Sequence, residues 1–97
     1  MTASLSTHVL DTGRGKPARD VRVELSLAGK EIAAARTDAD GRVEELARDL
    51  EPGPYTLAFH PPSPFFLRVE LELALDDGHY HVPLLVSPYS CASYRGS

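Results

Sequence analysis

The sequence predicts an all-β domain, a sandwich of two sheets with eight strands. Apolar and polar residues alternate over several short segments, and turn residues separate these segments about every eight to twelve positions. Alternation places successive side chains on opposite faces of a strand, so that one face can be buried. Ninety-seven residues are the length of one domain, and we expect residues 1–97 to form a single one.

The first expected strand covers residues 4–10. If Leu5 and Val9 face the core, His8 faces away from it. Residues 11–19 contain two glycines and a proline, which predict a connecting loop.

Three further strands are expected between residues 20 and 50. Residues 20–28 alternate most clearly, with valines and leucines inward, Leu27 included, and charged residues outward. Residues 31–37 follow a tight turn at Gly29 and are short for a helix, although alanines favour one. Residues 43–50 fit a strand but also have a helical pattern.

A strong turn precedes this last strand at residues 38–42. Its aspartates can accept hydrogen bonds from their own backbone, and Gly41 can adopt a positive φ. The turn predicts that Arg42 projects outward where the strand begins.

Four segments complete the expected strands. Residues 55–60 precede a proline-rich stretch that cannot lie inside a strand, and residues 65–75 then place Leu67 and the following alternate residues inward. Residues 79–86 form the histidine strand, and the tail that follows gives the eighth.

Composition excludes several classes of function. The net charge is −4 and no basic stripe occurs, which argues against nucleic-acid binding and against an anionic membrane surface. No apolar run reaches the roughly 18 residues of a membrane span, and the N-terminus does not resemble a signal peptide. The single cysteine, Cys91, cannot form an intrachain disulfide, so we expect a cytoplasmic protein.

The candidate chemistry lies in histidines, an arginine and hydroxyl groups. His79 and His81 share the non-core face of their strand, roughly 7 Å apart. With His8 and Arg42 they would provide a base near neutral pH and a fixed cation, a set that suits attack of water on a carbonyl. Each of these residues could instead be an ordinary surface residue.

Two other interpretations are weaker. His79 and His81 could be a zinc pair, but no carboxylates or cysteine are spaced to complete it. No phosphate loop, CxxC or GxSxG motif occurs, so nucleotide and serine-hydrolase functions have no support. Residues 94–97 could be a disordered end, although their Tyr-Arg-Gly-Ser composition favours a docked one.

Three motifs resemble those of the transthyretin-like family, in particular its 5-hydroxyisourate hydrolase branch. They are the N-terminal LSTHVLDT with GKPA at residues 15–18, the central TDADGR at residues 37–42, and HYHVPLL with SPY and the terminal YRGS at residues 79–97. The terminal YRGS is the most discriminating, because the hormone-carrying transthyretins lack it and lack the paired histidines.

The resemblance implies a prealbumin-like, eight-stranded sandwich that assembles as a homotetramer, a dimer of dimers, with its sites in a channel between dimers. It also implies hydrolysis of 5-hydroxyisourate in urate breakdown, without metal or other cofactor. Carried over residue by residue, His8, Arg42, His81 and Ser97 are the expected catalytic residues. His8, Arg42, Ser97 and Tyr94 are expected to bind the substrate.

The chain departs from the family pattern in two segments. Residues 60–66 replace a longer segment that often holds a short helix, so we expect this helix to be shortened or absent. Residues 90–92 are Ser-Cys-Ala where Gly-Tyr-Ser is common, and Cys91 fills less space than a tyrosine. The end of the sequence carries no peroxisomal tripeptide, in keeping with a cytoplasmic protein.

Two rival functions stay open. A non-catalytic transthyretin-like protein would hold a small ligand in the same channel, with apolar or hydroxyl residues in place of the histidines. A purely structural domain would have no docked terminus, so that removal of residues 94–97 would be harmless.

Overall fold

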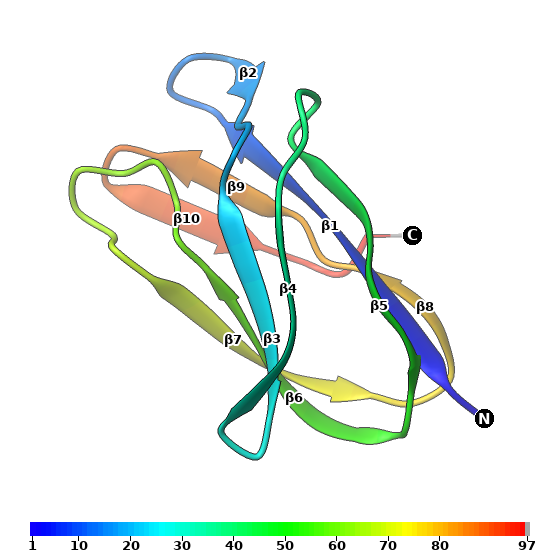
Figure 1. Ribbon diagram of the computed structural model, residues 1–97. Helices are drawn as coiled ribbons and strands as arrows, with labels where there is room; N and C mark the ends of the chain where they lie inside the picture. The colour runs from blue at the N-terminus through cyan, green and yellow to red at the C-terminus, as the bar shows by residue number, and fades with distance from the viewer. Residues whose placement is uncertain (97) are drawn as a thin grey trace.

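The computed structural model describes residues 1–96 and confirms the all-β fold, as Figure 1 shows. The described residues contain no helix, and residues 60–68 between β6 and β7 are coil and bends where relatives were expected to carry one. The strands are β1 (Ala3–Asp11), β2 (Lys16–Pro17), β3 (Arg22–Leu27), β4 (Lys30–Arg36), β5 (Arg42–Leu50), β6 (Gly53–Phe59), β7 (Val69–Leu75), β8 (Gly78–His81), β9 (Leu84–Ser87) and β10 (Ser90–Ser93).

The strands form two sheets, one of six strands and one of four. In the six-stranded sheet β1 pairs with β5 and β2 antiparallel and with β8 and β9 parallel, and β10 continues from β9. The four-stranded sheet has the order β4-β3-β6-β7. One sheet therefore holds the N-terminal strand, the strand after Arg42, the histidine strand and the last strand.

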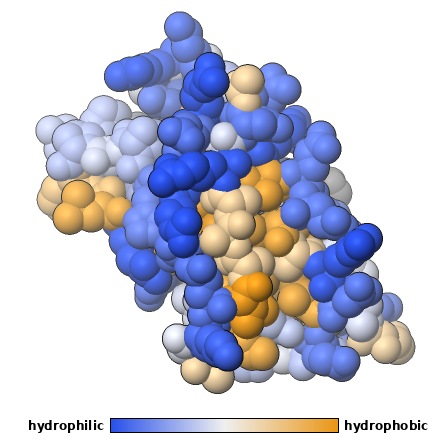
Figure 2. All heavy atoms as spheres, viewed as in Figure 1, coloured by the Kyte–Doolittle hydropathy of each residue, from blue (hydrophilic) through white to orange (hydrophobic). Residues whose placement is uncertain are grey.

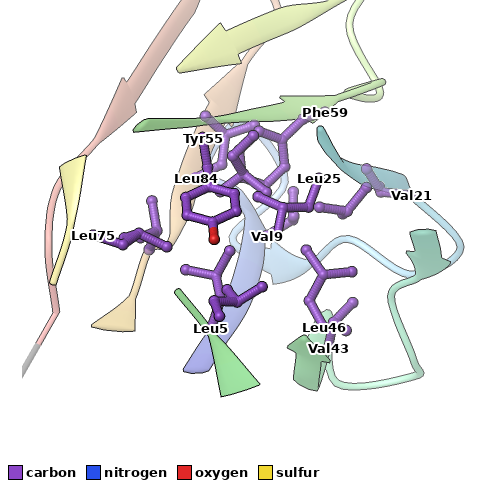
Figure 3. Close-up of a cluster of buried hydrophobic side chains, with 14 of the residues drawn as sticks. Leu5, Val9, Val21, Leu25, Val43, Leu46, Tyr55, Phe59, Leu75 and Leu84 are labelled. Carbon is purple, nitrogen blue, oxygen red and sulfur yellow. The ribbon is translucent and has the colours of Figure 1, made fainter. Parts of the chain in front are cut away.

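The core lies between the two sheets and follows the predicted alternation. Figure 3 shows side chains of both sheets meeting, among them Leu5 and Val9 from β1 and Phe59 from β6. These three side chains are fully buried, and each such burial stabilises the fold by roughly 1.5–3 kcal/mol. The buried Tyr55 is polar at one end only, and its hydroxyl donates to the carbonyl of Glu51 over 2.7 Å.

The spacing of the buried residues in β5 explains why residues 43–50 also have a helical pattern. The buried residues Val43, Leu46 and Leu50 are spaced by three and four positions, as on a helix. The register against β1 shifts twice along this pair, and Asp49 has a φ of 55°. These irregularities rotate the strand so that residues at helical spacing all reach the core. The interpretation of residues 43–50 as a strand is thus confirmed.

The predicted inward orientation is wrong for two residues. Leu67 is 80% exposed, because β7 begins at Val69 and not at residue 65. The hydroxyl of Ser63 accepts hydrogen bonds from the amides of Phe65 and Phe66, which extends the turn past the prolines. Leu27 is 40% exposed, because it lies at the end of β3 next to the turn.

The predicted strand 79–86 is divided into β8 and β9. Pro83 has no amide hydrogen for a ladder bond, so pairing is interrupted there. The neighbouring groups are satisfied locally, because the amide of Val82 donates to the carbonyl of Ser6 and the hydroxyl of Thr7 donates to the carbonyl of Val82. With β8 and β9 counted as one and the two-residue β2 set aside, the fold has the eight strands expected.

The surface of the four-stranded sheet is not uniformly polar. Figure 2 shows apolar side chains along the middle of the view, over β4 and toward β5 of the other sheet, between hydrophilic bands. Ile32 of β4 is 43% exposed. Within residues 1–96 no helix has the length and apolar character needed to cross a membrane.

Candidate active site

The turn before β5 places Arg42 directly opposite His8. One carboxylate oxygen of Asp38 accepts from the amides of Asp40 and Arg42, at 2.9 and 3.0 Å, as predicted for this turn. These hydrogen bonds lower the pKa of Asp38, so that it stays ionised at neutral pH. In the ladder between β1 and β5, His8 and Arg42 are Cα partners.

The same turn fixes the orientation of the His8 ring. Its Nε2 lies 2.8 Å from the carbonyl oxygen of Asp40. A carbonyl only accepts, so Nε2 carries the hydrogen and Nδ1 of neutral His8 is free to accept a proton. Gly41 makes this possible, because its φ is +75° and an added Cβ would lie 2.5 Å from the carbonyl oxygen of Val9.

Serines of β1 hold the two histidines of β8. In the parallel register Ser4 lies opposite His79 and Ser6 opposite His81. The hydroxyl oxygen of Ser6 is 2.7 Å from Nδ1 of His81 and 2.8 Å from Nε2 of His79. The hydroxyl oxygen of Ser4 is 2.7 Å from Nδ1 of His79.

A hollow of about 260 Å³ lies over this part of the sheet. Its lining consists of Ser6, Thr7, Arg42, Glu44 and His81. The sequence motifs on β1, β5 and β8 therefore contribute to one depression on the outer face of the six-stranded sheet.

His81 is poised to be neutral. Burial lowers its pKa below the ordinary 6.5, and the charge of Arg42 and the nearby imidazoles of His8 and His79 lower it further. At neutral pH the imidazole is therefore available as a base.

The end of the chain is docked on the histidine strand. The amide of Gly96 donates to the carbonyl of His81 over 2.6 Å, and the two residues form an isolated β-bridge. The guanidinium of Arg95 lies 4.1 Å from the ring centroid of Tyr80, in cation–π geometry. The expectation of a docked tail is confirmed as far as Gly96, and Ser97 lies outside the described residues.

Tyr94 lies apart from these groups. It is 56% exposed and borders a different hollow of about 460 Å³, along β7 and the residues after β10. The structure thus gathers His81 and Arg42 in one hollow with His8 beside it, and places Tyr94 elsewhere in this single chain.

Three residues of the hollow, Ser6, Thr7 and Glu44, are not among the site residues expected from the sequence. Ser6 shares the outer face of β1 with His8 by alternation, and Glu44 follows Arg42 at a spacing of two. Alternation therefore contained a signal for Ser6 and Glu44. Within residues 1–96 no group of three or more His, Cys, Asp or Glu is arranged to hold a metal ion.

Comparisons with known proteins identify the family of this chain. Residues 5–96 match the HIUase/Transthyretin family. The chain belongs to this family. The 5-hydroxyisourate hydrolase of Caulobacter vibrioides is 43% identical to this member of the HIUase/Transthyretin family, over 98% of this chain and 99% of the relative. That of Pseudomonas aeruginosa is 39% identical, over 96% of this chain and 90% of the relative.

Solved structures of the HIUase/Transthyretin fold show the same likeness. The 5-hydroxyisourate hydrolase of Klebsiella pneumoniae superposes with a TM-score of 0.91 at 33% identity, over 98% of this chain and 99% of the other. Sea bream transthyretin in complex with thyroxine gives a TM-score of 0.84 at 27% identity, over 95% and 93%. The alignment with the Caulobacter protein spans 114 positions against 97 residues here, so that relative carries residues this chain lacks.

Proposed function

We propose that this chain hydrolyses 5-hydroxyisourate to 2-oxo-4-hydroxy-4-carboxy-5-ureidoimidazoline, a step of urate breakdown in purine catabolism. The observation that carries the proposal is the meeting of His81 and Arg42 in one hollow, with His8 opposite Arg42. Relatives named 5-hydroxyisourate hydrolase are about 40% identical over nearly the whole chain.

Each residue has a role in the proposed reaction. His8 and His81 hold and deprotonate the attacking water, for which a neutral imidazole is required. Arg42 orients the planar substrate and stabilises negative charge that develops on the carbonyl oxygen. Ser97 and the backbone of the tail complete the hydrogen bonds to the substrate. Tyr94 borders a different hollow of the same chain, so its proposed contact with the substrate comes from a neighbouring subunit of the proposed assembly. The histidines supply the base and Arg42 supplies the positive charge that stabilises the oxyanion, so the proposed reaction needs no metal or other cofactor.

The proposed unit is a single domain, residues 1–97, that assembles as a homotetramer of two dimers with the sites in the channel between them. Edge strands β7 and β10 support association, because an unpaired edge can pair with another chain. Between them lies the hollow of about 460 Å³, lined in part by Leu71, Leu73 and Val82. A chain of this size buries only about 60–65% of its unfolded surface, so an interface would add stability. Sedimentation velocity would test the assembly, and a monomer at micromolar concentration would contradict it.

We place the protein in the cytoplasm, with its single cysteine as a free thiol. Cys91 is half-buried, and burial raises the pKa of its thiol, which keeps it protonated and unreactive at neutral pH.

The experiment is the ultraviolet decay of freshly generated hydroxyisourate with and without the protein. Faster decay is expected, and it should be lost in a variant that lacks residues 94–97. A decay equal to the spontaneous rate would contradict the proposal and favour a ligand-binding protein. Full activity of the truncated variant would contradict the role of the tail.

A further inference from the structure

A continuous row of hydrogen-bonding groups leads away from His81. It runs from Nδ1 of His81 to the hydroxyl of Ser6, then to Nε2 of His79, and from Nδ1 of His79 to the hydroxyl of Ser4. The three contacts measure 2.7, 2.8 and 2.7 Å, which are short for hydrogen bonds that involve nitrogen. The sheet builds this row, because Ser4 and Ser6 alternate on β1 opposite His79 and His81 on β8.

The row joins a sheltered site to solvent. Ser6 is buried at 6% exposure, while His79 is exposed. No hydrogen bond within residues 1–96 involves Nε2 of His81, whereas its Nδ1 is held by Ser6. The ring therefore has one nitrogen fixed in the row and the other free for the hollow.

The row can carry hydrogens in either direction. A hydroxyl between two imidazoles donates to one and accepts from the other. When Nδ1–H of His81 donates to Ser6, Ser6 donates to His79, and His79 donates to Ser4, so Nε2 of His81 is a bare base. When every donor is reversed, Nε2 of His81 carries the hydrogen. Both arrangements satisfy every group without any charged ring.

The charges around His81 favour release of a proton from its ring over retention of the proton. The charged and titratable groups around His81 are His8 from β1, Arg42 and Glu44 from β5, and His79 from β8. Three of these four are cations or potential cations, and burial adds to the cost of an imidazolium at His81. A proton taken up there is held weakly and should leave.

We propose that Ser6 and His79 are positioning residues that relay a proton from His81 to solvent during hydrolysis; this relay rests on the proposed function. Nε2 of His81 takes one hydrogen from the attacking water, and its Nδ1 hydrogen moves to Ser6. The hydrogen of Ser6 moves to His79, that of His79 Nδ1 moves to Ser4, and that of Ser4 leaves to solvent. One proton enters the row and one leaves it.

The reaction requires such an exit. Its C–N bond breaks and a C–O bond forms, the second hydrogen of water ends on the released nitrogen, and the product is a carboxylate at neutral pH. Each turnover thus releases one proton net, which the row delivers outside the hollow.

Steady-state kinetics in increasing concentrations of imidazole buffer, at constant ionic strength, would test the relay. Ser6→Ala is expected to lower kcat roughly tenfold to 10²-fold, with KM within about threefold, and imidazole should restore part of the loss. Ser6→Thr keeps the hydroxyl and should keep most of the kcat. Ser26→Ala, the same change on β3 of the other sheet, is the matched control. An unchanged kcat in Ser6→Ala would overturn the relay. So would an equal loss of kcat in Ser6→Ala and Ser6→Thr that imidazole does not restore.

A second variant and a second readout make the outcome decisive. His79→Gln fills a similar volume but cannot pass a proton through two ring nitrogens, and should show the same imidazole dependence even if Ser6→Ala does not fold. Nitrogen-15 spectra of the imidazoles should show coupled titrations of His79 and His81 in the wild type and independent titrations in Ser6→Ala. Independent titration in an active wild type would overturn the relay and leave the proposed function intact. If the titrations are coupled but the wild type does not accelerate hydroxyisourate decay, the proposed function is overturned, and with it the proposal that the row relays a proton during hydrolysis.

Discussion

Gly96 and His81 lie so close that a residue larger than glycine at position 96 would force one of them to shift. A Cβ added there would be 2.8 Å from Cδ2 of the His81 ring and 3.3 Å from the His81 carbonyl oxygen. The amide of Gly96 donates to that same carbonyl over 2.6 Å. The end of the chain is thus fitted against the candidate base by backbone contact.

Gly96→Ala should therefore impair catalysis more than stability. The methyl group must displace the tail or the ring of His81, and displacement of a catalytic group by about 1 Å can cost roughly 10²-fold in rate. Hydroxyisourate decay and a thermal melt would be measured together. Gly13→Ala is the control, since its nearest neighbour is the ring of Pro88 at 3.2 Å, away from the site. Equal activities of the two variants would contradict the positional role of Gly96.

His81→Asn should keep the fold and lower turnover by roughly 10²-fold or more, because the general base is removed. His60→Asn is a matched control, since His60 directly follows β6 of the other sheet and its Nε2 lies 3.2 Å from a carboxylate oxygen of Glu24. Undiminished hydrolysis by His81→Asn, with circular dichroism like that of the wild type, would refute the role of His81.

The pKa of His81 should lie below 6.5, because burial and neighbouring cations both disfavour the imidazolium. Arg42→Gln removes one cation and should raise it, as a proton NMR titration of the ring would show. Activity in the wild type should accordingly persist below pH 6.5, until His81 is protonated. An Arg42→Gln variant whose His81 titrates at the same or a lower pH would contradict this electrostatic coupling.

The same depressed pKa makes the fold sensitive to acid. Unfolded His81 binds a proton more readily than folded His81, so protons stabilise the unfolded state between the two pKa values. The His81 contribution to the free energy of unfolding should therefore fall as pH drops from 6.5 through the folded pKa, and stay level above that window. Urea titrations of wild type and His81→Asn at several pH values would isolate this contribution, and identical slopes with pH would contradict it.

Gly41→Ala should destabilise the protein far more than Gly29→Ala. Both glycines have positive φ, of +75° and +80°, which costs an alanine about 1–2 kcal/mol. Only at Gly41 would the new Cβ also meet backbone, at 2.5 Å from the Val9 carbonyl oxygen, so the total should reach roughly 2–5 kcal/mol. Urea unfolding would give both values, and similar losses at the two positions would show that strain alone decides them.

The sequence predicted the strands where alternation and turn residues were strong. Within the predicted strand 20–28, β3 covers Arg22–Leu27, and the turn at Gly29 was found as expected, although Leu27 is exposed. The errors arose where local rules compete: residues 65–68 alternate like a strand, but Ser63 holds their start in a turn through its hydroxyl. Residues 43–50 kept apolar residues at helical spacing, and two register shifts accommodated them in a strand.

By itself the sequence determined the all-β class, the outer face for His8, His79 and His81, and the chemistry available, because alternation and turn preferences are local properties. Only the tertiary structure decided which of these groups meet. The pairing of β1 with both β5 and β8 brings His8, Arg42 and His81 together from distant parts of the chain, and sets Ser6 between two imidazoles. Strand pairing is non-local, and a shift of one residue would turn every one of these side chains to the opposite face.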